Sequence, residues 1–495
     1  MAPTTFFNDN DLLDNEIGLA TISLLRTGFC PEGAQALPYQ ARLATIIKDL
    51  NAGLLAPVRR LPTEILQLIF LAFVEKEDSY DWARILRAKI MPVCFTWRET
   101  AKGYPYIWTY VDISRPPLPM TRWWTQLDPN QVERQIARTG QLPLGIQYCC
   151  NSQMELDPIL DQCGPRLRSF AFGGTCHELV DQRQFDLPIL TSVAIAISGQ
   201  ISKLTLSIIA GAPNLQHLSL VQSRTHLAAF AFEPWVQSMS LDFPRFPRLT
   251  HLSISLVTAL TSCDLWRVIE SCHDTLTTLI VDASIIPSSA ASTPMLTLTS
   301  LHTIDLTSNV IVIGTFISAP NIVSVSLRDI SDAVAPPCIF GLIRRLASGM
   351  ATKSLRCVTL ERVSSWGACL ADVVCTQAMA TVEHLEILDR PTALLPPRRY
   401  VPFMRAMLYT PGKQPLFPSL RYLSLLCGGH HIEDGLQDAM DDFQESRRAE
   451  IVGQVAHLEV FATNVERDRT FHMYDSEDED EDDAAEVEIS LLTSH

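Results

Sequence analysis

Leu215-Gln-His-Leu-Ser-Leu220 and Leu249-Thr-His-Leu-Ser-Ile254 share one pattern, apolar-x-x-apolar-x-apolar, which recurs along most of the chain. The eleven instances are Leu167/Phe170/Phe172, Leu190/Val193/Ile195, Leu215/Leu218/Leu220, Leu249/Leu252/Ile254, Leu276/Leu279/Val281, Leu301/Ile304/Leu306, Ile322/Val325/Leu327, Leu355/Val358/Leu360, Val382/Leu385/Ile387, Leu420/Leu423/Leu425 and Val455/Leu458/Val460. A strand of this kind buries its apolar side only against neighbours. The series therefore predicts one short strand per repeat, stacked so that the triads share one core.

The spacing and flanks of the triads refine this prediction. Successive triads begin between 21 residues (301 to 322) and 38 residues (382 to 420) apart, and the wider spacings predict helices and insertions on the convex side. Proline turns precede several triads, at 212–214, 319–321 and 417–419. The asparagine that usually follows such a triad is mostly missing, with Asn309 the clearest instance, so we expect degenerate repeats. The alternative is an irregular α/β domain whose strands do not stack in sequence order.

Between Pro57 and Ile113 the pattern is helical. The stretch Leu61-Pro-Thr-Glu-Ile-Leu-Gln-Leu-Ile-Phe70 continues as an apolar helix to Val74, in which only Gln67 is polar after Ile65. Proline suits a first helical turn, and Glu64 complements the positive end of the helix. A helix that is apolar all round must be covered on more than one side. Because a block of about fifty residues cannot do this alone, a partner is implied.

The second half of this block reads Met91-Pro-Val-Cys-Phe-Thr-Trp-Arg98 and then Tyr104-Pro-Tyr-Ile-Trp108. Val93, Cys94, Trp97 and Ala101 fall on one helical face, and Gly103 is placed to end the helix. In this order the pieces resemble the F-box, in which a Leu-Pro-x-Glu-Ile-Leu-x-x-Ile-Phe helix precedes a Val-Cys-x-x-Trp-Arg helix and an aromatic-Pro-x-x-Trp segment. The resemblance covers about residues 57–113.

The resemblance implies a three-helix module that binds the Skp adaptor of a cullin–RING ubiquitin ligase. The family's contact positions fall on Leu61, Pro62, Ile65, Leu66, Ile69, Phe70, Val93, Cys94, Trp97 and Trp108. Two features depart from the family pattern: a polar insertion at 75–81 follows the first helix, and Pro92 stands directly before Val-Cys. They predict that the second helix starts late.

Downstream, Arg138-Thr-Gly-Gln-Leu-Pro-Leu-Gly-Ile146 and the repeats resemble the F-box/leucine-rich-repeat proteins of mushroom-forming fungi. We therefore expect an α/β chain in which a three-helix F-box module precedes an open, horseshoe-shaped leucine-rich-repeat solenoid. The expected divisions are a poorly ordered segment (1–38), an amphipathic helix (39–56), the F-box (57–113), a linker (114–130), the solenoid (131–465) and an acidic disordered tail (466–495). Within the solenoid, residues 131–139 predict a helix closed by Gly140, and residues 142–148 a strand.

The implied function is that of a substrate receptor in a Skp–cullin–F-box ligase. The alternatives are a plain repeat scaffold that the F-box-like segment caps, an adaptor-bound protein acting outside a ligase and, last, an enzyme. No catalytic, cofactor or metal site is predicted: His177-Glu178 lacks a second histidine, Gly412-Lys413 lacks the rest of a phosphate loop, and His430-His431 fits a polar turn.

Composition limits the partners and the compartment. The formal net charge of −16 argues against a nucleic-acid partner, although the acidic run at 475–483 supplies half of it. That run predicts a solvated tail in which Ser476 is a candidate phosphorylation site. The thirteen cysteines form no Cys-x-x-Cys pair, which favours a reduced, cytoplasmic or nuclear chain. We expect neither a signal peptide nor a membrane span.

Residues between the triad positions point away from the core, so we expect target recognition on the concave face across residues 249–425. A central column of small residues is expected at Ser219, Ser253, Ser326, Thr359 and Ser424. The candidate target-binding residues are His251, Asp282, Asp305, Arg328, Glu361 and Glu386, with His384 beside them. Acid predominates, which favours a basic target. His217, His251, His384 and His457 occupy one repeat position and could form a line, but the favoured interpretation is a local preference for a polar, moderately bulky residue at that position. The competing hypothesis is that insertions such as 388–416 bind the target.

Overall fold

The computed structural model describes residues 61–76, 90–91, 93–113, 129–149, 156–175, 184–198, 203–222, 238–286, 295–314, 316–330, 355–363, 377–388, 400–409, 417–426, 435–447 and 455–463. The expected N-terminal segment (1–38), amphipathic helix (39–56) and acidic tail with Ser476 lie outside these residues. His177-Glu178, Gly412-Lys413 and His430-His431 lie outside them as well.

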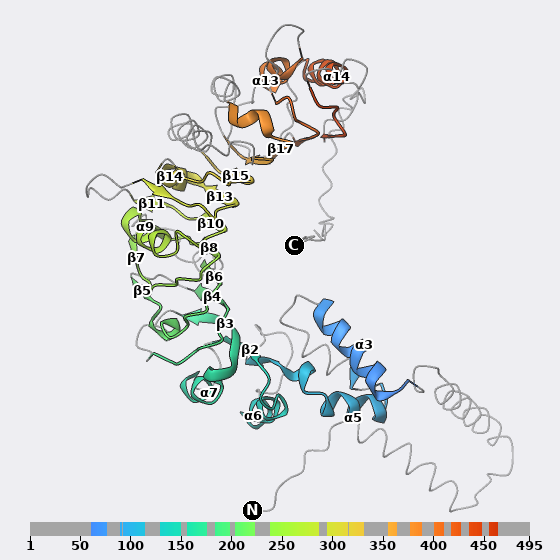
Figure 1. Ribbon diagram of the computed structural model, residues 1–495, viewed down its shortest axis with the longest axis vertical. Coiled ribbons are helices and arrows are strands. Elements are labelled where there is room, and N and C mark those ends of the chain that lie inside the picture. Colours follow the sequence, from blue (N-terminus) through green and yellow to red (C-terminus); the bar gives the residue numbers. More distant parts are fainter. Residues whose placement is uncertain are drawn as a thin grey trace, which may run out of the picture.

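One long parallel sheet organises the described chain. Its strands, in spatial order, are β1 (Tyr110–Ile113), β2 (Leu144–Cys149), β3 (Leu167–Thr175), β4 (Ser192–Ser198), β6 (His217–Gln222), β8 (His251–Ser255), β10 (Thr278–Asp282), β13 (Thr303–Thr307), β15 (Ser324–Arg328), β16 (Cys357–Glu361), β17 (His384–Leu388), β18 (Tyr422–Leu426) and β19 (Val460–Thr463). Spatial order equals sequence order, so the alternative of strands out of order is wrong. The fold is mixed α/β, and the sheet bends into an open arc that does not close into a barrel (Figure 1).

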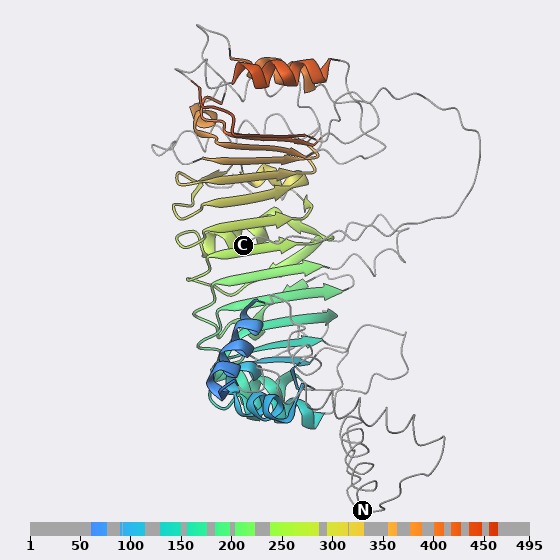
Figure 2. The same ribbon diagram turned by 90° about the vertical axis from the view of Figure 1, so that its right-hand side faces the viewer.

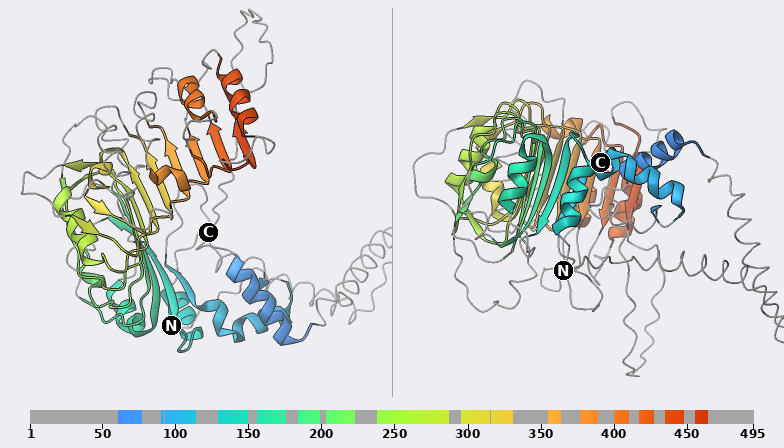
Figure 3. Two further views of the ribbon diagram at one scale, coloured as in Figure 1. Left: turned by 45° about the horizontal axis from the view of Figure 1, so that its top comes forward. Right: turned by 90° about the horizontal axis from the view of Figure 1, so that it is seen from below.

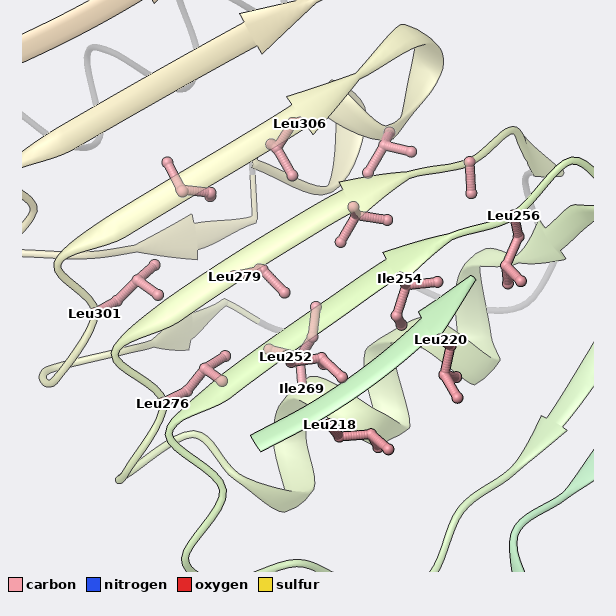
Figure 4. Packing of buried hydrophobic residues seen from close by; sticks show 14 of the residues in the cluster. Leu218, Leu220, Leu252, Ile254, Leu256, Ile269, Leu276, Leu279, Leu301 and Leu306 are labelled. Carbon is pink, nitrogen blue, oxygen red and sulfur yellow. The ribbon is translucent and has the colours of Figure 1, made fainter. Parts of the chain in front are cut away.

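The triads form the shared core, as expected. The register places Leu252 beside Leu279 and Leu279 beside Ile304, so equivalent triad residues of neighbouring strands lie in rows. Figure 4 shows these rows, with Ile269 of the helix α9 (Ser262–Ser271) packed against them. All members of the first ten triads are buried in one hydrophobic cluster. Burial of an aliphatic side chain stabilises by about 1.5–3 kcal/mol, so this cluster is the main stabilising feature of the sheet.

The eleventh triad is predicted in the wrong register. Val460 pairs with Tyr422 and Phe461 with Leu423, so the residues equivalent to Leu420, Leu423 and Leu425 are Leu458, Phe461 and Thr463. Val460 is consequently exposed on the other face. An edge strand has one neighbour, which weakens the burial that fixes register elsewhere.

A second layer covers the outer side of the arc. Part of it is a short sheet with the order β11 (Ile285–Ile286), β9 (Ala259–Thr261), β7 (Ser238–Asp242) and β5 (Lys203–Thr205), and part is the pair β12 (Leu296–Thr297) and β14 (Ile317–Ser318). The helices of this layer are α6 (Pro129–Arg138), α7 (Leu156–Cys163), α9 (Ser262–Ser271), α10 (Ile311–Gly314), α13 (Tyr400–Met407) and α14 (Leu436–Ser446), with the short 3-10 helices η4 (Gly164–Arg166), η5 (Ser207–Ile209), η7 (Ser308–Val310) and η8 (Gln377–Thr381). Figure 3 shows the main sheet lining the inner side of the arc.

Side chains at several turns form hydrogen bonds with the backbone of the preceding repeat. The Nδ2 atoms of Asn214 and Asn321 donate to the carbonyls of Pro188 and Thr299, at 2.6 and 2.8 Å. Asn309 bonds both backbone groups of Ile285, donating to its oxygen at 2.7 Å and accepting from its nitrogen at 2.8 Å. The predicted proline turns and Asn309 therefore satisfy backbone groups that strand pairing leaves open.

Two expected boundaries shift. Residues 110–113, assigned to the helical block, form the first strand of the sheet, and the helix expected from residue 131 begins at Pro129, inside the expected linker. The helix α6 and the strand β2 are otherwise confirmed, and Gly140 ends the helical segment in a left-handed conformation, with φ of 59°. The insertion 388–416, which the competing hypothesis assigns to target binding, contains α13.

Candidate functional site

The segment before the sheet has its own small core. It consists of α3 (Thr63–Lys76), α5 (Phe95–Gly103) and the 3-10 helix η3 (Pro105–Trp108), and we call it the helical module. Its buried residues are Leu66, Phe70, Ile90, Ala101, Ile107 and Trp108, with Leu61 and Trp97 packed against them. The rings of Phe70 and Trp97 meet edge to face, with centroids 5.2 Å apart.

Burial divides the ten expected adaptor contacts. Leu66, Phe70 and Trp108 lie inside the module, and Trp108 Nε1 donates to the Ala101 carbonyl at 2.7 Å. These three side chains therefore form part of the module's core. Leu61, Cys94 and Trp97 are half-buried, whereas the expected contacts that are exposed are Pro62, Ile65, Ile69 and Val93.

The exposed apolar side chains of the helical module form what we call the module face: Ile65, Leu68, Ile69, Val93, Phe95 and Tyr106. They are six of the thirteen exposed large apolar side chains in the described chain, and Leu68 and Phe95 are 59% and 73% exposed. The sequence analysis missed Leu68, Phe95 and Tyr106. Leu68 stands three residues after Ile65, so helical spacing places it on the same side as Ile65 and Ile69.

Local backbone geometry explains where Val93 and Phe95 lie. Cys94 is extended, with φ of −166°, and precedes the first residue of α5. The late start of the second helix is thus confirmed, and the expectation that Val93 shares a helical face with Trp97 is wrong. Because both residues stand at the helix entry instead of inside a helical stripe, Val93 and Phe95 remain exposed.

The helical module is joined to the sheet through side chains as well as through the chain. The guanidinium of Arg138 lies 4.8 Å from the ring centroid of Trp108. Gln135 Nε2, also on α6, donates to the Tyr110 carbonyl at 2.6 Å. The nitrogen of Gly145 donates to the Thr109 carbonyl at 2.8 Å. The module is therefore attached to the first strands of the main sheet, at one end of the arc (Figure 1).

The second candidate surface is the side of the main sheet opposite the triads, which we call the inner face (Figure 2). Strand pairing aligns its residues in columns: Ser219 lies beside Ser253, and Ser326 beside both Asp305 and Thr359. The expected alternation is therefore confirmed. The candidate target-binding residues all lie on this face: His251 is exposed, Asp282, Asp305, Arg328 and Glu386 are half-buried, and Glu361 is 8% exposed.

Many charges of the inner face are paired with one another. Arg328 holds Asp305 with two hydrogen bonds, Nε to Oδ1 at 2.9 Å and Nη2 to Oδ2 at 2.8 Å. Arg362 forms the same kind of bidentate ion pair with Asp329, and its Nη1 lies 3.0 Å from Glu361 Oε1. Asp329 and its bonding to Arg362 raise the pKa of that guanidinium. The sequence analysis missed Asp329 and Arg362, which follow the strands in left-handed conformations.

The four histidines at this repeat position do not form one line. His217 and His251 stack on neighbouring strands with ring centroids 4.3 Å apart, and burial and His217 lower the pKa of His251. His384 stacks instead on Tyr422, at 4.1 Å. His457 precedes β19 and is off the ladder, because the register of that strand differs from the expected one.

Among the described residues, no three His, Cys, Asp or Glu side chains gather closely enough to hold a metal ion. None of the helices in the described part of the chain has the length and apolar character needed to cross a bilayer. Neither a scan against protein-family models nor a search of curated proteins finds a match to this chain.

Proposed function

We propose that this chain is a substrate receptor of a Skp–cullin–F-box ubiquitin ligase. The helical module would be the F-box that binds the Skp adaptor, and through it cullin. The main sheet would be a leucine-rich-repeat solenoid that binds a protein target. Such a receptor catalyses nothing itself. It holds the target beside a ligase-bound ubiquitin donor, which raises the effective concentration of the reacting groups.

The module face is the observation that carries this proposal. Ile65, Leu68 and Ile69 lie along one side of α3 in water, although the same helix buries Leu66 and Phe70 in the module. Exposed apolar side chains concentrated in one small region are typical of a protein-binding surface. The motif residues Pro62, Ile65, Ile69 and Val93 are exposed there, which is what adaptor binding requires.

The attachment of the module supports the receptor geometry but also suits the rival function. Contacts such as Arg138 on Trp108 fix the module against the sheet, so a bound adaptor and a bound target would keep a constant relation. The same contacts would let the module cap the end of a plain repeat scaffold. A cap, however, needs its buried contacts with the sheet and not an exposed apolar side on α3.

Adaptor binding to the full chain tests the proposal. The double variant Ile65→Ser/Ile69→Ser removes two exposed apolar side chains and leaves the module core intact. We expect its affinity for a purified Skp adaptor, measured by titration, to fall at least about tenfold, because buried contact residues of this kind contribute roughly 1–3 kcal/mol each. Leu61→Ala/Pro62→Ala should weaken binding in the same direction.

Ile189→Ser/Val257→Ser is the matched control, since these side chains are similarly exposed, at 37% and 39%, but lie in the sheet region. It should bind the adaptor as the wild type does. If the wild type does not bind any Skp adaptor, or if the α3 variant binds unchanged, the receptor role is excluded. Co-purification of cullin with the wild-type complex separates a ligase subunit from an adaptor-bound protein that works outside a ligase.

A further inference from the structure

Two carboxylates on the inner face differ from the rest. Asp282 accepts from Thr307 Oγ1 at 2.8 Å and from Ser255 Oγ at 3.4 Å, and Glu386 accepts from Thr359 Oγ1 at 3.3 Å. In the described part of the chain, no arginine or lysine forms an ion pair with either of them. Hydroxyl groups orient both carboxylates but leave their negative charges uncompensated.

The carboxylates between these two are neutralised internally. Asp305 is held by Arg328, and Arg362 is held by Asp329 and Glu361. Asp282 also acts on Arg362 through space, but that guanidinium is already engaged by its two bonded partners. A ligand would have to break existing ion pairs to use the middle of this region. It meets no such competition at Asp282 and Glu386.

The sheet fixes the separation of the two carboxylates. Asp282 is on β10 and Glu386 on β17, and the intervening strands are β13, β15 and β16, which gives four strand-to-strand steps. At about 4.8 Å a step, they are roughly 19 Å apart across the sheet. An extended polypeptide advances about 3.3 Å per residue, so a separation of six residues covers about 20 Å.

Short side chains flank one side of the line that joins the two carboxylates. The first residue of each strand from β10 to β16 has a short side chain, and strand pairing places these residues side by side: Thr278, Thr303, Ser324 and Cys357. Beyond them, on β17 and β18, stands the stacked ring pair of His384 and Tyr422. His384 is two residues before Glu386 on the same side of β17, so a planar cation that pairs with Glu386 would lie beside an aromatic surface.

We infer that the inner face between β10 and β17 binds an extended segment of the target that carries two cationic side chains about six residues apart, the first at Asp282 and the second at Glu386. This rests on the proposed function for its target. Arginine suits the Glu386 end, because a guanidinium pairs with a carboxylate through two donors and stacks on rings. Two point contacts at a fixed separation make the spacing of the cations, and not their number, the basis of selection.

Isomeric peptides test the spacing. The probes are two fluorescent peptides of identical composition, otherwise Gly and Ser, with arginine at i and i+6 in one and at i and i+2 in the other. Fluorescence anisotropy with the full chain should show the i,i+6 peptide binding about tenfold tighter, because only this peptide reaches both carboxylates. Net charge, including that of the rest of the acidic chain, acts equally on both probes.

Asp282→Asn and Glu386→Gln keep the side-chain shapes and an oxygen that accepts from a neighbouring hydroxyl but remove the charge, and each should abolish the preference. Asp438→Asn/Asp442→Asn, which neutralises two exposed acids on α14, should leave the preference intact. Equal binding of the two probes by the wild type, or a preference that survives Asp282→Asn and Glu386→Gln, overturns the inference. Adaptor binding with no spacing preference removes this site and leaves the receptor role. A spacing preference without adaptor binding removes the receptor role and leaves the site.

Discussion

The guanidinium of Arg138 lies 4.8 Å from the ring centroid of Trp108, whose indole nitrogen donates to the Ala101 carbonyl at 2.7 Å. One tryptophan thus joins three parts of the chain: α5 through its hydrogen bond, the module core through its buried ring, and α6 through the cation. Trp108 belongs to the family-like segment, whereas Arg138 belongs to the sheet region. Their contact therefore joins the module that is proposed to bind the adaptor to the sheet that is proposed to bind the target.

Loss of this contact should loosen the helical module without unfolding the sheet. Arg138→Ala removes an exposed cation–π pair of about 0.5–1 kcal/mol, while Trp108→Ala removes a buried ring and should cost about 3–5 kcal/mol. Hydrogen exchange should rise in α5 and η3 in both variants, more in the second, with little change in β8 and β10. Glu133→Ala, an exposed change on the same helix, should leave exchange unaltered. Faster exchange across the whole sheet would show that module and sheet unfold as one unit.

Gly211 is a position that only glycine can occupy, because a Cβ there would collide with the carbonyl oxygen of Phe185. The close approach lets Leu187 donate from its nitrogen to the Gly211 carbonyl at 3.1 Å. Gly211→Ala should lower the free energy of unfolding by about 1–3 kcal/mol or more, since backbone on both sides must shift.

Gly173 on β3 is the matched comparison, because the nearest atom to a Cβ there, the Tyr148 oxygen, is 3.9 Å away. Gly173→Ala should leave the free energy of unfolding unchanged or slightly raised, as alanine restricts the unfolded chain. Equal changes in the free energy of unfolding of the two variants, measured by urea denaturation, would mean that the chain relieves the collision at Gly211 without cost.

The sequence predicts the ten ordered strands because each triad must be buried on both flanks, which leaves one register for each strand. It does not predict the register of β19, where Leu458/Phe461/Thr463 ends in a polar residue and the overlapping Val455/Leu458/Val460 matches the pattern better. It misses the outer sheet too, since strands as short as Ile285–Ile286 have no alternation to detect.

The sequence pattern indicates most charged residues of the inner face, though not Asp329 or Arg362, and it does not indicate which of them pair. Asp305 and Arg328 lie 23 positions apart, and only strand register brings them together. On α3 the difficulty is the reverse: from Ile65 to Val74 every position but Gln67 is apolar, so the pattern cannot say that Leu66 and Phe70 face inward while Leu68 faces water. The candidate surfaces are therefore predictable as regions, but which side chain does what depends on packing.

Burial of the Cys272 thiol, directly after α9, should make the folded chain less stable at alkaline pH. Desolvation raises the pKa of the Cys272 thiol from 9.0 to about 12, and its Sγ lies 3.3 Å from the Val268 carbonyl. Because the folded pKa exceeds the unfolded one, the unfolded state binds fewer protons above pH 9. The thiol's contribution to stability is complete below pH 9 and is lost as the pH rises towards about 12, at up to about 1.4 kcal/mol per pH unit.

Cys272→Ala removes the ionisable group and with it this dependence on pH. Urea denaturation between pH 7 and 10.5 should therefore show that the free energy of unfolding of the wild type, relative to that of Cys272→Ala, decreases above pH 9. Val268→Ala, on the same helix and without an ionisable group, should differ from the wild type by a constant amount. A constant difference for Cys272→Ala as well would show that the thiol ionises equally in the folded and unfolded states.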